Sequence, residues 1–117
     1  MSVFFAPGPD EGERLDRGYR RARVLGDLPH LEVLELTFES GFEGVDPHSH
    51  ADHTDTFYVL EGEVEFLVDG GWRRCGPGTF LSVPPGVEHG FRLAGSHRIR
   101  LLNIHAPRVG FIDSLRD

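Results

Sequence analysis

The sequence lacks several features that would place it in a well-defined class of proteins. It has one cysteine, Cys75, among 117 residues, so no disulfide can form within the chain. That usage fits a reducing compartment. No stretch approaches the ~18 apolar residues of a membrane span, and residues 1–9 lack the basic segment of a secretory signal. We therefore expect a soluble, cytoplasmic protein with no membrane partner.

An excess of positive charge is also missing. Lysine and arginine number 12 against 19 aspartates and glutamates, which gives a formal net charge of −7. Nucleic acids and anionic membranes bind to basic surfaces, so we expect no nucleic-acid partner. Cys75 lies in the segment WRRCGPG with no obvious base beside it, and a reactive thiol needs an activating neighbour. A nucleophilic role for it is therefore disfavoured.

Turn-forming and aromatic residues are plentiful. The chain has 15 glycines, 8 prolines and 9 phenylalanines, a composition typical of an all-β domain with short strands. Its length allows one compact domain. We expect an irregular N-terminal arm over residues 1–18 and a β-barrel domain over residues 19–117. Only residues 111–117 read as helical, and then for a single turn.

Strand patterns are clearest in three segments of the sequence. Residues 31–38 alternate in part, and we expect Glu32 on the outer face. Residues 64–68 place their valines and phenylalanine on one face. In residues 97–105, arginines alternate with apolar residues, so the opposite face must look inward.

The inward face of that last strand carries two polar residues, Asn103 and His105. A buried polar side chain needs a partner or a function. His105 is therefore a candidate catalytic residue, and a hydrogen-bonded core histidine is the equal alternative. Asn103 is a candidate substrate-binding residue beside it.

The spacing of the histidines suggests a metal site. His48 and His50 lie two residues apart, so in an extended segment both project from one face. Asp55 follows at the entry to a β-rich segment, and His89 comes after the Pro-Pro-Gly turn. Three imidazoles and a carboxylate suit one divalent transition metal: Fe, Mn, Ni, Co or Zn. His53, between these residues, is expected to be an exposed turn histidine.

The two segments that carry these histidines resemble the two motifs of the cupin superfamily. Residues 48–62 read HSHADHTDTFYVLEG, and residues 78–89 read GTFLSVPPGVEH. The resemblance implies a double-stranded β-helix, the cupin jelly-roll barrel, with a metal inside one open end. It also implies a homodimer, often with exchanged N-terminal strands. Asp55 stands where the motif usually has glutamate, which is one methylene longer.

The resemblance leaves the reaction open, because function depends on the site. We expect a small organic substrate, aromatic or polyketide-like, in a pocket walled by Phe57, Phe66, Phe80 and Phe91. The first hypothesis is a metal-dependent dioxygenase or related oxidoreductase. The second is a metal-dependent isomerase, epimerase or cyclase in which His105 moves protons. The third is a small-molecule-binding cupin without enzymatic activity.

Overall fold

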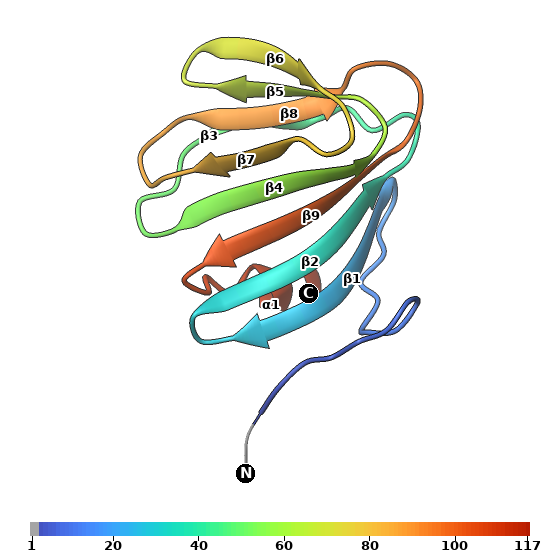
Figure 1. The fold of residues 1–117 in the computed structure, drawn as a ribbon, viewed down its shortest axis with the longest axis vertical. Helices are drawn as coiled ribbons and strands as arrows, with labels where there is room; N and C mark the ends of the chain where they lie inside the picture. Colours follow the sequence, from blue (N-terminus) through green and yellow to red (C-terminus); the bar gives the residue numbers. More distant parts are fainter. Residues whose placement is uncertain (1–2) are drawn as a thin grey trace.

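The computed structural model describes residues 3–117, which form antiparallel strands and one short helix (Figure 1). The strands are β1 (Arg20–Leu28), β2 (Leu31–Phe38), β3 (Val45–His48), β4 (Thr54–Glu61), β5 (Val64–Val68), β6 (Gly71–Cys75), β7 (Phe80–Val83), β8 (His89–Leu93) and β9 (Ile99–Ala106). The helix, α1, spans Phe111–Leu115, within the segment that the sequence marks as helical.

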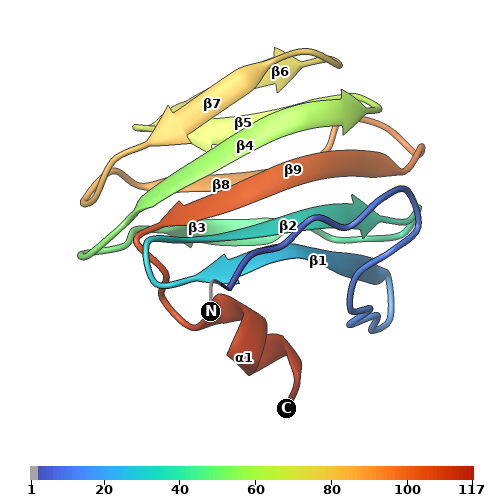
Figure 2. The same cartoon turned by 60° about the horizontal axis from the view of Figure 1, so that its bottom comes forward.

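The strands form two facing sheets. One has the order β1-β2-β9-β4-β7 and the other the order β3-β8-β5-β6. In Figure 2 the two sheets lie one behind the other, and α1 lies beside β1 at one open side. This confirms the expected all-β jelly roll with little helix.

Alternation along the strands builds the interior. On β2, Leu34, Leu36 and Phe38 are at most 5% exposed, and the residues between them are half-buried. On β9, Ile99 and Leu101 are fully buried. Side chains two apart on a strand share a face, so these rows interlock between the sheets as one core.

Glu32 does not lie on the outer face of β2, as the sequence suggests, but is completely buried. It belongs to the same inward row as Leu34, and its carboxylate is satisfied from the C-terminal segment. The backbone N–H groups of Val109, Phe111 and Ile112 donate to it at 3.1, 3.1 and 3.3 Å. A buried carboxylate with several such donors is stable as the anion.

The N-terminal arm runs beside its own β1. Residues 3–18 contain no strand, but isolated bridges join Arg14 to Arg23 and Arg17 to Arg20. Residues 1 and 2 of the expected arm lie outside the described residues. No helix in the described chain is long and apolar enough to cross a membrane.

Candidate metal centre

Strand register brings the candidate metal ligands together from both sheets. In the larger sheet, Asp55 on β4 pairs with His105 on β9, which pairs with Glu32 on β2. In the smaller sheet, His48 at the end of β3 pairs with His89 at the start of β8. These two rows face one another at the same end of the barrel.

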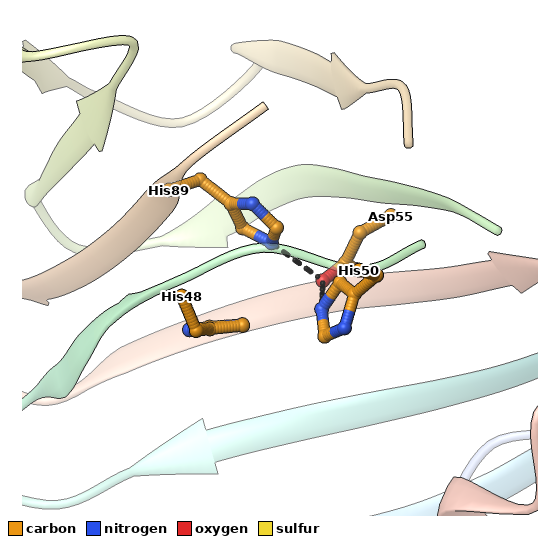
Figure 3. A group of neighbouring side chains, drawn as sticks. All are labelled: His48, His50, Asp55 and His89. Carbon is orange, nitrogen blue, oxygen red and sulfur yellow. Dashed lines mark hydrogen bonds and ion pairs between the residues drawn. The ribbon is translucent and has the colours of Figure 1, made fainter. Parts of the chain in front are cut away.

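Four predicted ligands converge at this end. Figure 3 shows His50 and His89 joined by dashed lines to the Asp55 carboxylate, with His48 beside them. One ligand atom from each of the four residues lies within 4.8 Å of the others. Asp55 Oδ2 lies 3.0 Å from His89 Nε2 and 3.4 Å from His50 Nε2. The shorter aspartate therefore still reaches the imidazoles.

The donor set fits a divalent transition metal. His48 Nδ1 lies 2.8 Å from the carbonyl oxygen of Asp46, and His89 Nδ1 lies 3.0 Å from that of Val87. A carbonyl only accepts, so each Nδ1 donates its proton, and Nε2 is the nitrogen of each ring that is available to a metal ion. Such bonds orient metal-binding histidines. Three imidazole nitrogens and one carboxylate oxygen form the mixed shell that the sequence predicts.

Asp55 connects this cluster to a second group of polar side chains. It is 4% exposed, and its Oδ1 accepts a hydrogen bond from Asn103 Nδ2 at 2.8 Å. His105 Nε2 lies 3.3 Å from the same oxygen. Burial raises the pKa of Asp55, but hydrogen bonds from His105, His89 and Asn103 outweigh it and hold the pKa well below its usual range. Asp55 is therefore ionised, as a metal ligand must be.

His105 lies between two buried carboxylates. Its Nδ1 is 3.1 Å from Glu32 Oε1, and its Nε2 faces Asp55. Burial lowers the pKa of His105, but hydrogen bonds and charges from Asp55 and Glu32 raise it by more. Both Asn103 and His105 are at most 5% exposed, as alternation on β9 predicts.

A cavity of about 410 Å³ opens beside the cluster. Of the four phenylalanines expected in its wall, Phe57 and Phe91 line it. Phe66 instead packs behind them in the core, with ring centres 5.2 and 5.8 Å from theirs. Phe80 is 64% exposed, because it pairs with the outward-facing Tyr58 across β4 and β7. Its assignment to the wall was wrong.

His53 was also misplaced by sequence reasoning. It is only 5% exposed and lines the cavity. The rings of His50 and His105 lie 4.2 and 5.2 Å from its ring. His53 Nδ1 lies 2.9 Å from Asp52 Oδ1, and its Nε2 is buried without a hydrogen-bond partner among the described residues.

Glu32 and Arg20 complete the group that sequence reasoning missed. Arg20 lines the same cavity, and its position in the row of Ala22 and Val24 on β1 was the available signal. Glu32 likewise shares its row with Leu34, but the groups that satisfy its carboxylate lie 73 to 80 residues further along the chain and leave no local signal.

Comparison with known proteins assigns the family. The family model described as the cupin domain matches residues 34–105, which include all four candidate ligands. The chain belongs to the cupin family.

Two groups of curated relatives of this cupin are dioxygenases. It is 34% identical over 101 residues to quercetin 2,3-dioxygenase of Bacillus subtilis (strain 168), which covers 83% of this chain and 29% of that protein. It is 34% identical over 89 residues to acireductone dioxygenase of Rhodopseudomonas palustris (strain ATCC BAA-98 / CGA009), covering 73% of this chain and 50% of that one. The chain thus spans about half or less of the length of these relatives.

Solved structures support the fold of the cupin over nearly its whole length. An RmlC-like cupin from Shewanella frigidimarina has a TM-score of 0.79 at 30% identity, with 92% of this chain and 93% of that one covered. KdgF from Halomonas sp. has a TM-score of 0.80 at 23% identity, with 96% and 99% covered. At that identity, the likeness to KdgF concerns the fold alone.

Proposed function

We propose that this cupin is a metal-dependent enzyme of the dioxygenase type that acts on a small organic substrate. The observation that carries the proposal is the convergence of His48, His50, Asp55 and His89 on one point beside a cavity with apolar walls. A bound Fe, Mn, Ni or Co ion would supply Lewis-acid and redox chemistry there.

The remaining side chains have separate roles in this proposal. Phe57 and Phe91 hold the apolar body of the substrate and exclude water, which strengthens polar interactions inside the cavity. Asn103 fixes the Asp55 carboxylate through the 2.8 Å hydrogen bond. His105, held between Glu32 and Asp55, presents the polar edge of its imidazole to the cavity and helps to position the polar end of the substrate.

The two dioxygenase relatives support the proposal through sequence similarity, independently of the site geometry. Both share about a third of their aligned residues with this chain over most of its length. Because the chain spans only part of each relative, their substrates serve as starting points for a screen.

The test is oxygen consumption by the protein loaded in turn with Fe(II), Mn(II), Ni(II) and Co(II). Quercetin and catechol are the first substrates to offer. We expect uptake above the rate without protein, lost in a His50→Ala variant and reduced in His105→Gln at unchanged metal content. Equal rates for wild type and His50→Ala, or no uptake with any metal across a wider screen of phenols and enols, would contradict the proposal.

One observation favours a second candidate, a metal-dependent isomerase or cyclase. The Glu32–His105–Asp55 row places an acid–base group beside the metal cluster, and proton transfer needs such a group more than oxygen chemistry does. Turnover under anaerobic conditions with Zn(II) would favour this candidate. Tight ligand binding with no turnover under either condition would favour a binding protein.

A further inference from the structure

The cavity is lined by a cation, Arg20, that has no ion-pair partner among residues 3–117. Within residues 3–117, two buried side-chain polar atoms lack a hydrogen-bond partner, Arg20 Nε and His53 Nε2, and both residues line this cavity. A buried polar atom without a partner destabilises the folded state, because it has lost its hydrogen bonds to water. Two such atoms around one cavity indicate that the cavity is built to meet a ligand.

Arg20 is held in the wall by the register of β1. It pairs with Phe38 on β2 and precedes the buried Ala22 and Val24 by two and four residues. Side chains at this spacing point to the same face, so Arg20 points inward. It is half-buried, and Leu36, Phe38, Val45 and Phe91 line the cavity with it.

No carboxylate in the described part of the chain compensates this charge. The acidic group that acts on it, Asp16, is engaged by Arg14 and Arg21 at 3.3 and 3.9 Å and by the N–H of Ala22 at 3.1 Å. Burial and the neighbouring Arg17 lower the pKa of Arg20, yet a guanidinium remains charged in proteins. Acidic residues outnumber basic ones in this protein, whose formal net charge is −7, so a half-buried cation without a carboxylate partner among the described residues is unexpected.

The position of Arg20 relative to the metal cluster limits the size of the ligand. Across the sheet, Arg20 shares a row with Phe38 and Ile99, whereas Asn103 beside Asp55 lies four residues further along β9. Four residues of strand span about 13 Å. An arginine side chain covers part of that distance, which leaves room for a ligand about one ring and a short chain in length.

We propose that the ligand of this cavity is a small organic acid. Its carboxylate pairs with the Arg20 guanidinium, its apolar body lies against Phe38 and Phe91, and its other polar end reaches the metal cluster. Guanidinium and carboxylate match as a bidentate, charge-assisted pair, and apolar surroundings strengthen that pair. This proposal rests on the proposed function and names its substrate class.

The probes are three phenolic acids of increasing length: 4-hydroxybenzoate, 4-hydroxyphenylacetate and 3-(4-hydroxyphenyl)propionate. Each is compared with its own amide, which keeps the shape and removes the charge. Dissociation constants are measured by titration calorimetry on metal-loaded protein. We expect at least one acid to bind about 10- to 100-fold more tightly than its amide.

Variants on β1 test whether Arg20 is responsible for the preference for the acid over its amide. Arg20→Gln, or Arg20→Met if the glutamine variant fails to fold, should remove the preference for the acid while the affinity for the amide stays within about twofold. Arg21→Gln is the matched control, because Arg21 neighbours Arg20 but is exposed. The Arg21→Gln variant should prefer each acid over its amide by the same factor as the wild type.

Two results would overturn the proposal. One is the absence of any acid-over-amide preference across the panel, including no binding at all. The other is a preference that survives in the folded Arg20 variant, which would mean that the metal rather than Arg20 takes the carboxylate. Metal content is measured on every sample, and the titrations are repeated after chelator treatment. A protein that holds no metal but keeps an Arg20-dependent preference would refute the proposed function and leave this inference standing.

Discussion

The Asp55 carboxylate contacts four other side chains of the site. Its Oδ2 lies near His50 and His89, and its Oδ1 is fixed by Asn103 and His105. A carboxylate held from one side and open to imidazoles on the other is already oriented for a metal. Pre-orientation of this kind is what neighbouring hydrogen bonds contribute to metal affinity.

We predict that Asp55→Asn lowers the affinity for Zn(II) about 10- to 100-fold or more, because the hard anionic ligand is lost. The measurement is competition with a chromophoric chelator. His53→Asn is the matched control, since His53 is equally buried and lies two residues away. Its affinity should stay within about threefold of wild type. A larger loss in His53→Asn than in Asp55→Asn would mean that His53 replaces Asp55 as the fourth ligand.

Glu32 gives a prediction with a pH dependence. Burial raises the pKa of this carboxyl, but three backbone N–H groups and His105 lower it by more, so the net shift is downward from 4.5. A group with a lowered pKa stabilises the fold above its unfolded pKa, and that contribution is lost as the pH falls through the folded pKa. Glu32→Gln should therefore cost about 1–3 kcal/mol of unfolding free energy at pH 7.

The difference between wild type and Glu32→Gln should shrink as the pH falls below about 4.5. Urea denaturation from pH 7 to pH 3 measures it. Glu43→Gln, a change at an exposed glutamate, should differ little from wild type throughout. A Glu32→Gln deficit that stays constant across this range would show that the carboxylate charge contributes nothing.

At the scale of elements, the short helix α1 closes one side of the cavity. It is too short to be stable by itself, and contacts with the barrel hold it. Glu32 accepts the N–H groups at its start, and Ile112 is fully buried in the core. Phe111 places its ring edge-on to His105, with centres 5.1 Å apart. Docking of the C-terminal segment therefore depends on Glu32 and His105, two of the polar side chains in the site.

We predict that Ile112→Ala destabilises the protein by about 2–4 kcal/mol through lost burial and a cavity. Ser114→Ala, on the exposed side of the same helix, should change the stability by less than about 0.5 kcal/mol. Thermal and urea unfolding of both variants give the comparison. Equal stabilities for Ile112→Ala and Ser114→Ala would mean that α1 does not dock as described.

Sequence patterns predict some elements of this fold well and others poorly, for physical reasons. The segment 31–38 is the strand β2, and parity on β9 correctly turns Asn103 and His105 inward. Alternation predicts the orientation of these side chains because one face of each strand is directed at the core and the other at solvent. Glu32 was assigned to the wrong face because its charge is neutralised by groups distant in sequence.

Site residues in loops and at sheet edges were the least predictable. His53 lies in a turn, where residues are usually solvated, but the neighbouring imidazoles enclose it. Phe80 is apolar on an edge strand, and hydrophobicity alone does not say which face it occupies. The motif spacing nevertheless identified the four residues that the fold gathers into one cluster.

At the scale of the whole molecule, we predict a homodimer. The larger sheet ends in β7, where Phe80 is 64% exposed, and the smaller sheet has β3 and β6 at its edges. Unpaired edges and exposed aromatic side chains favour association. The arm already covers the edge of its own β1, which favours the other edges as the interface. Sedimentation velocity at micromolar concentration should show a dimer, and a monomer at all concentrations would contradict this prediction.

The central claim is that His48, His50, Asp55 and His89 hold one divalent transition metal ion. The direct test is elemental analysis of untagged protein. The protein is measured as purified, and again after loading with Fe, Mn, Ni, Co or Zn and desalting. We expect close to one metal ion per chain in the wild type. His89→Ala and His50→Ala should retain almost none, although both remain folded. A wild type that holds no stoichiometric metal under any of these conditions, or a His89→Ala variant with full occupancy, would contradict the account.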